Sequence, residues 1–230
     1  MRTAKLQSFM ILLKVEALTG HLIPFLGRVY LTQGEKNYAM HGQNGSNLNT
    51  GKNLVFSGAE GYINLKNDVH QGAGSLTFKD NYTVASESGS IWTGAGLIVE
   101  KDAIVTWKVN GENGDALHKI GEGTLYINGN GINPGNIRVG DGTVILSQRP
   151  DVNGNTQAFN KLTITSGRPT VVLADAHQLK PDNIYFGYKG GRLDVNGIDL
   201  IFNRIKNADS GAHIVNNKDV AATLTITGRG

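Results

Sequence analysis

A glycine-rich stretch, HKIGEGTLYINGNG at residues 118–131, is the first candidate for chemistry in this sequence. Gly121, Gly123, Gly129 and Gly131 surround a short apolar run, and glycine loops of this kind can bind phosphate. A dinucleotide site needs G-x-G-x-x-G between a strand and a helix, because the pyrophosphate sits on the helix N-terminus. Here the first two glycines precede the apolar run, tyrosine occupies the third glycine position, and no helical pattern follows. We therefore interpret the glycines as bends of a structural scaffold and predict no cofactor.

The segment ADSGA, residues 208–212, contains the Asp-Ser-Gly order of serine-protease nucleophile turns. Alanine stands where that motif has its first glycine, and alanine also replaces its second serine. His213 is too close in sequence for the usual fold, and His70, His118 and His177 have no recognisable triad context. We interpret the segment as a loop turn and predict no catalytic residue.

A polysaccharide lyase would combine basic residues with carboxylates that converge on calcium. SGRPTVVLAD offers Arg168, Pro169 and Asp175, but the sequence has no run of carboxylates. We interpret Arg168 as a corner charge beside a proline that fixes a turn. The six histidines show no ligand spacing, so no metal site is predicted. The chain has no cysteine, which excludes disulfides, thiolate metal sites and cysteine nucleophiles.

Aromatic side chains offer another possible site, as a surface for sugar or peptide. The candidates are Trp92, Trp107, Phe159, Tyr185, Phe186 and Tyr188. Neighbouring residues of a strand point to opposite faces, so Tyr185 and Phe186 are expected to point in opposite directions. We expect at least half of these aromatic residues to lie in the core.

The formal charge of +3 is unevenly distributed over the 230 residues. Residues 1–52 carry six basic and two acidic groups, a net charge of +4, and the remainder carries −1. The body of the chain shows no basic stripe with interleaved aromatic residues. Nucleic acid is therefore not expected as a partner.

The first 50 residues form an atypical segment that we expect to be partly helical or disordered. KLQSFMILLKVEALTG has apolar residues at helical spacing and ends at Gly20, so a short amphipathic helix is predicted. Lys14 and Glu16 interrupt its apolar run, which makes it a poor export signal. No stretch reaches the roughly eighteen apolar residues that span a bilayer. The polar residues 41–51 then separate this segment from the next unit, residues 51–230.

Residues 51–230 contain short runs of alternating apolar residues, each closed by Gly, Asn or Asp. The runs include residues 53–58, 62–68, 75–81, 96–102, 104–111, 123–131, 143–148, 161–167, 170–176, 183–190, 192–197 and 223–228. The spacing of these runs was measured between the leading apolar residues of every second or third run, which are Leu54, Leu76, Leu97, Leu125, Val144, Leu162 and Ile184. Successive residues of this series are separated by 22, 21, 28, 19, 18 and 22 positions. A period near 22 predicts an all-β fold, a right-handed single-stranded parallel β-helix (solenoid) with three short strands per coil, whereas a sandwich of hairpins lacks a long-range period.

Stacked coils would place alternate side chains in one continuous interior. Leu125 and Ile127 are predicted to face that interior, and Thr124, Tyr126 and Asn128 to face water. Each corner needs a sharp bend, often with positive φ, which glycine adopts without penalty. Corners are also predicted at residues 139–143, 188–192 and 194–199.

Several long segments occur in an order typical of one protein family. They are HQGAGSLTF (70–78), WTGAGLIV (92–99), LHKIGEGTL (117–125), VGDGTVIL (139–146), SGRPTVVLAD (166–175), PDNIYFGYKGGRLDVNG (181–197) and GAHIVNN (211–217). Over about residues 41–228 the sequence resembles the passenger region of the serine protease autotransporters of Enterobacteriaceae, relatives of the IgA-specific serine endopeptidases.

The resemblance implies a secreted bacterial virulence factor with a signal sequence, an N-terminal chymotrypsin-like protease domain, a β-helical stalk and an outer-membrane translocator barrel. The matching residues resemble the first coils of the stalk. The family's catalytic His, Asp and Ser all lie before this stretch, so none is placed on this chain. The first 40 residues do not resemble the family, and we expect an incomplete, frame-shifted or internally started reading frame.

We therefore predict a non-catalytic, monomeric stalk fragment, secreted or on the cell surface, that presents the protease domain and supports export. Its partners would be its own protease domain and translocator barrel. An alternative from a different class is an adhesin, or a glycan- or protein-binding module, that binds a host ligand through Tyr185 or Trp92. A lyase is a third hypothesis.

The first coil of such a stalk would expose unpaired backbone groups. We predict that the N-terminal helix covers the coil that begins at Leu54, through Leu6, Phe9, Met10 and Leu13.

Overall fold

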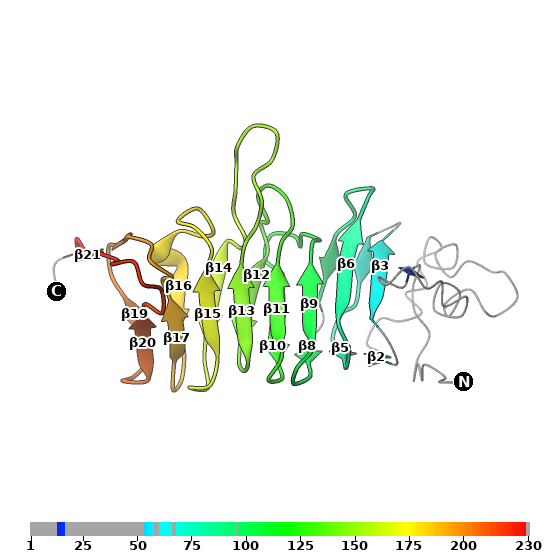
Figure 1. The fold of residues 1–230 in the computed structure, drawn as a ribbon, viewed down its shortest axis with the longest axis horizontal. Coiled ribbons are helices and arrows are strands. Elements are labelled where there is room, and N and C mark those ends of the chain that lie inside the picture. The colour runs from blue at the N-terminus through cyan, green and yellow to red at the C-terminus, as the bar shows by residue number, and fades with distance from the viewer. Residues whose placement is uncertain (1–12, 17–52, 58–59, 66–67, 95, 229–230) are drawn as a thin grey trace, which may run out of the picture.

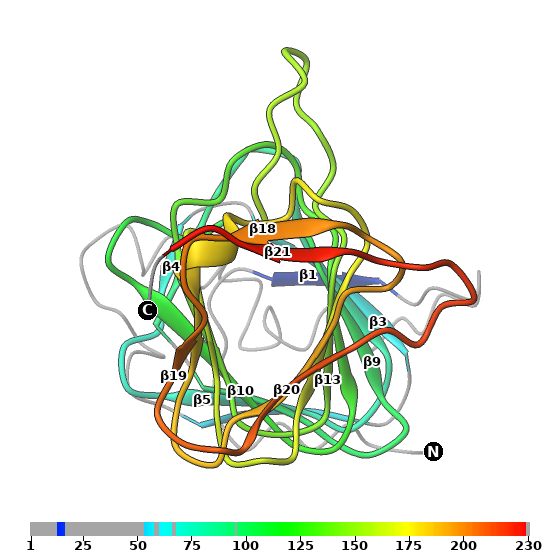
Figure 2. The same cartoon turned by 90° about the vertical axis from the view of Figure 1, so that its left-hand side faces the viewer.

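The computed structural model describes residues 13–16, 53–57, 60–65, 68–94 and 96–228. Its backbone winds in successive coils stacked along one axis (Figure 1). Seen along that axis, the coils lie one behind another (Figure 2). The parallel β-helix predicted from the sequence is therefore confirmed. No helix in the described ranges is long and apolar enough to cross a membrane.

Two long sheets form two sides of the β-helix. Sheet A has nine strands, in the spatial order β1 (Leu13–Glu16), β3 (Gly61–Leu65), β6 (Tyr82–Ser86), β9 (Ile104–Trp107), β11 (Thr124–Ile127), β13 (Thr143–Leu146), β15 (Thr170–Leu173), β17 (Gly191–Asp194) and β20 (Ala212–Val215). Sheet B has eight, in the order β19 (Lys206–Asn207), β16 (Ile184–Phe186), β14 (Lys161–Ile164), β12 (Asn136–Val139), β10 (Ala116–Ile120), β8 (Gly96–Val99), β5 (Ser75–Phe78) and β2 (Leu54–Phe56). Each coil contributes one strand to each sheet, so neighbouring strands are parallel, except that β1 pairs antiparallel with β3.

A third side is less regular. Its short elements are β4 (Val69–His70) paired with β7 (Trp92–Thr93), β18 (Leu200–Phe202) paired with β21 (Leu224–Ile226), and the 3-10 turn η2 (Pro181–Asn183). The connection between β13 and β14 projects beyond its neighbours (Figures 1 and 2). Insertions of this kind lengthen one coil without changing the strands on either side of it.

The helix predicted near the N-terminus is wrong over Leu13–Glu16. These residues form β1, which pairs antiparallel with β3, Leu13 opposite Leu65 and Glu16 opposite Tyr62. A strand wins here because the outer edge of β3 offers backbone groups that only an extended partner can pair. The other residues proposed for the cap, Leu6, Phe9 and Met10, lie outside the described residues.

The predicted period is right, but the residues chosen to measure it do not form one column. In sheet B the aligned positions are Leu54, Leu76, Leu97, Lys119, Val139, Ile164, Phe186 and Asn207, at steps of 22, 21, 22, 20, 25, 22 and 21. Leu125 and Val144 belong to the facing sheet A. The error arose because alternation looks the same in both sheets, and only the pairing distinguishes them.

Inward-facing side chains fill the space between the sheets. Leu125 and Ile127 are 0% and 1% exposed, as predicted, while Thr124, Tyr126 and Asn128 are half-buried on the outer face. The first coils hold an aromatic cluster in which the rings of Phe56 and Phe78 stack at 4.7 Å. Burying such a side chain stabilises a fold by roughly 1.5–3 kcal/mol. The stacked interior is therefore the main source of stability.

Candidate functional site

The ADSGA segment forms a turn held by Asp209. Its carboxylate accepts hydrogen bonds from the backbone N–H groups of Lys189, at 2.8 Å, and Gly211, at 2.9 Å. These bonds, the one from Lys189 first, hold the pKa of Asp209 below its ordinary value. Ser210 is exposed, and no hydrogen bond among the described residues joins it to a histidine. The carboxylate therefore orders the backbone of the turn.

Arg168 and Asp175 have different partners. The exposed Arg168 guanidinium pairs with Asp141, Nε to Oδ2 at 3.2 Å. Asp175 instead accepts hydrogen bonds from the backbone N–H of His177 and the side-chain amide of Gln178. Within the described ranges, no group of three or more His, Asp or Glu side chains is placed to hold a metal ion. The structure thus does not join the two residues in a cluster of the kind a lyase would use.

Most of the candidate aromatic residues lie in the core. Trp92, Trp107, Phe159 and Phe186 are buried, and the two tryptophan rings lie 5.5 Å apart. The alternative hypothesis of a binding face named Trp92, and the structure contradicts this part of it because Trp92 is 2% exposed and lies in the core. The outer candidates are Tyr185, which is half-buried, and Tyr188, which is 70% exposed.

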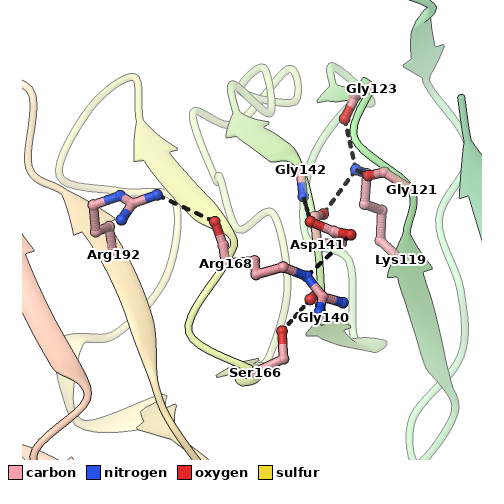
Figure 3. A network of polar contacts seen from close by, with 9 residues as sticks. All are labelled: Lys119, Gly121, Gly123, Gly140, Asp141, Gly142, Ser166, Arg168 and Arg192. Carbon is pink, nitrogen blue, oxygen red and sulfur yellow. Dashed lines mark hydrogen bonds and ion pairs between the residues drawn. The ribbon is translucent and has the colours of Figure 1, made fainter. Parts of the chain in front are cut away.

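A buried lysine, missed in the sequence analysis, occupies the interior beside the glycine-rich stretch. Lys119 stands in the sheet B column between Leu97 and Val139 and is 0% exposed. Its Nζ donates to the carbonyl oxygens of Gly121, at 2.6 Å, Gly123, at 2.6 Å, and Asp141, at 2.8 Å (Figure 3). An ammonium group has three N–H donors, so these three carbonyls satisfy it completely.

The glycines of this stretch let the carbonyls approach the ammonium group. A Cβ atom at Gly142 would lie 2.4 Å from the Nζ of Lys119 and 2.3 Å from the carbonyl oxygen of Gly121. Gly121 itself has a φ of +84°, and a Cβ there would lie 2.2 Å from the carbonyl oxygen of Val99. The cradle that resembles a phosphate loop in the sequence therefore holds the protein's own cation.

The lysine is linked to polar groups on several coils (Figure 3). Asp141, whose carbonyl oxygen binds Lys119, pairs through its carboxylate with Arg168. Arg192, one coil further, donates to the carbonyl oxygen of Arg168 at 3.2 Å. Burial lowers the pKa of Lys119 to about 8, and the Asp141 carboxylate opposes that shift. A lysine with such a pKa can act as a base or a nucleophile, but here every N–H is bonded and none is accessible. We therefore interpret Lys119 as a structural residue.

A groove of about 530 Å³ opens on the outer face of sheet B. Its lining residues are Gly72, Ala73, Gly74, Gly94, Gly96, Gly114, Asp115, Ala116, His118 and Arg138. The Asp115 carboxylate accepts hydrogen bonds from the Gly94 N–H at 2.9 and 3.0 Å, which fixes it at the groove. Burial, and then the charge of Arg138, lower the pKa of His118, while Asp115 opposes the shift. The groove is therefore polar, with a fixed carboxylate and a guanidinium.

No protein family model matches the chain. Individual relatives do. The serine protease SepA autotransporter of Shigella flexneri and the serine protease EatA of Escherichia coli are each 53% identical to it over 196 residues, 85% of this chain and 14% of each relative. The IgA-specific serine endopeptidase autotransporter of Neisseria gonorrhoeae is 50% identical over 188 residues, 81% of this chain and 12% of that protein.

Solved structures of related passenger regions have the same fold. The crystal structure of the Haemophilus influenzae Hap adhesin superposes with a TM-score of 0.73 at 48% identity, over 77% of this chain and 19% of that one. The passenger domain of the plasmid-encoded toxin of enteroaggregative Escherichia coli gives 0.66 at 35% identity, over 76% of this chain and 19% of that one.

The fold and these matches define the described part of the chain as a passenger β-helix. Over most of its length the chain is similar to a segment of the serine protease autotransporters, as the sequence resemblance indicated. It spans about one seventh of the length of the curated relatives it matches.

Proposed function

We propose that residues 51–230 are a non-catalytic stalk segment that presents a protease domain and supports export by folding. The continuous apolar interior carries this proposal, because it runs through successive coils from Leu54 to Phe202. Residues 1–50 form a separate N-terminal segment in this proposal. The parent protein would be secreted or displayed on the bacterial surface, like its autotransporter relatives, with the stalk as a monomer.

The geometry suggests how such a segment would support export. Each completed coil exposes a row of backbone groups and apolar side chains on which the next coil can pair and pack. Stability is therefore gained coil by coil, without a nucleus that involves the whole chain. A segment that emerges gradually from a membrane could fold on the coils already outside, and this folding would oppose its return.

The purified chain is expected to leave casein and mucin intact. In the turn that resembles a protease motif, the Asp209 carboxylate accepts hydrogen bonds from backbone N–H groups. The exposed Ser210 has no histidine partner in the described structure. Release of soluble peptides, followed over hours with and without a serine-directed inhibitor, measures this. Inhibitor-sensitive hydrolysis that is lost in Ser210→Ala would overturn the non-catalytic proposal.

A second candidate is a binding role for the outer face of the coils. The groove beside His118 and Arg138 favours it, because the groove combines a concave surface with charged groups held in fixed positions. The similarity to the Hap adhesin is consistent with this role. Saturable binding of a host glycan or matrix protein would distinguish it from a purely mechanical stalk.

A further inference from the structure

A row of aligned positions crosses the outer face of sheet B from the groove toward the C-terminal coils. The residues in register are Gly96, His118, Arg138, Thr163, Tyr185 and Lys206. Lys161 lies beside this row, two residues before Thr163 on β14. Arg138, Lys161 and Lys206 therefore place positive charges on the same face of three strands. We call these three residues and Tyr185 the cationic row.

The two lysines of the cationic row are held by contacts, and none of the three charges of the row is neutralised by an ion pair within the described residues. The Lys161 and Lys206 Nζ atoms lie 4.0 and 4.5 Å from the centroid of the Tyr185 ring. Lys206 also donates to the Tyr185 hydroxyl at 3.1 Å and to the carbonyl oxygen of Asp182. In the part of the chain that the structure describes, no carboxylate forms an ion pair with Arg138, Lys161 or Lys206. The row therefore keeps its positive field and holds its ammonium groups in place.

The spacing of the row fits a linear ligand with repeated negative charges. Strands of a parallel sheet lie roughly 4.8 Å apart. Arg138 and Lys161 lie on adjacent strands, offset by two residues, and Lys206 lies two strands beyond Lys161, so the charges recur at roughly 5–10 Å. The groove at one end adds a different group, because the Asp115 carboxylate can accept hydrogen bonds from hydroxyl groups. A ligand that matches both features carries anionic groups along its length and hydroxyls between them.

We propose that the cationic row and the adjoining groove bind an acidic glycan, a chain of sugars that bears sulfate or carboxylate groups. This inference rests on the binding role proposed for the outer face and does not depend on the presentation of a protease. Nucleic acid fits less well for two reasons. The Tyr185 ring is occupied by two ammonium groups and is not free to stack on a base. The backbone of duplex DNA also has no hydroxyl group that could donate a hydrogen bond to Asp115.

Binding of the purified chain to four immobilised probes tests the ligand class. Heparin carries sulfates and carboxylates, polygalacturonate carries carboxylates alone, dextran is neutral, and duplex DNA is a polyanion without sugar hydroxyls along its edge. We expect saturable binding to heparin or to polygalacturonate and none to dextran, and the pair identifies which anion is preferred. Absence of binding to both acidic glycans would overturn the proposal, and equal or tighter binding of DNA would overturn the assignment to a glycan.

Matched double variants locate the site. R138Q/K161Q removes two charges from the row, and K101Q/K218Q removes two exposed charges from elsewhere. The row variant is expected to bind at least about tenfold more weakly, with a salt dependence of log K shallower by about two. The control is expected to bind like the wild-type chain, and both variants should keep the wild-type unfolding midpoint. Equal weakening by the two variants would show attraction by net charge alone and would overturn the site.

Discussion

Replacing Lys119 by methionine is expected to lower the free energy of unfolding by about 2–3 kcal/mol at pH 7. Methionine fits the apolar column between Leu97 and Val139, but it donates no hydrogen bond. The carbonyl oxygen of Gly123 would keep a second donor, the Thr143 N–H at 3.2 Å. The carbonyl oxygens of Gly121 and Asp141 would lose the bonds they accept from the ammonium group. Guanidinium denaturation, followed by circular dichroism, measures the loss.

Lys180→Met is the matched control, because Lys180 is exposed and the substitution is chemically the same. Its effect is expected to stay within about 0.5 kcal/mol. If Lys119→Met were as stable as the wild-type chain, the three carbonyl contacts would contribute nothing net. The buried ammonium group would then be tolerated by the fold without stabilising the contact between coils.

The difference between wild type and Lys119→Met is expected to grow with pH. The folded pKa of Lys119 is about 8, below the unfolded value of 10.5, so between these values the unfolded chain binds more protons. The contribution of Lys119 to the free energy of unfolding of the wild-type chain therefore increases as the pH rises from about 8 to 10.5. Between pH 7.5 and 9.5 the gap should widen by about 2 kcal/mol. If the difference in free energy of unfolding between the two chains became smaller with pH, the folded pKa of Lys119 would lie above the unfolded value. The carbonyl oxygens would then bind the charged ammonium group more strongly than water does.

The alternation of apolar residues was sufficient to predict the architecture. All twelve runs identified from the sequence overlap a strand of the structure, from β2 at Leu54–Phe56 to β21 at Leu224–Ile226. Some strands were not among those runs. They include β10, where Lys119 takes an inward position, and β12, where the inward Ile137 and Val139 alternate with the outward Asn136 and Arg138. The pattern fails in β10 because a polar side chain is buried, whereas β12 alternates regularly and was overlooked.

The polar features of the structure depend on contacts between coils, which the sequence does not display. Leu117 and Lys119 share one face of β10, so the alternation itself placed the lysine inward, but one of its acceptors, Asp141, lies 22 positions away. The residues of the cationic row are likewise separated by a coil or more, so the neutral composition of the body concealed them. A search for charged residues repeated at the coil period could have found Arg138 and Lys161.

Replacing Gly121 by alanine is expected to cost about 4 kcal/mol, more than its backbone conformation alone explains. Two effects combine at this residue. A φ of +84° disfavours any residue with a Cβ atom, and that atom would lie 2.2 Å from the Val99 carbonyl oxygen of the preceding coil. The backbone of either coil must shift to relieve this clash, and the shift would disturb the carbonyl that binds Lys119. Chemical denaturation of the variant measures the total.

Gly154→Ala separates the two effects. Gly154 has a φ of +81°, almost the same as Gly121, yet a Cβ atom there would meet nothing within 4 Å. Its substitution should therefore report the conformational cost alone, about 1 kcal/mol. The difference between the two variants is then the cost of separating adjacent coils. If the two variants lost the same free energy of unfolding, the backbone at Gly121 could shift to accept a Cβ atom at little cost. Close packing around Lys119 would then no longer explain why this corner contains glycine.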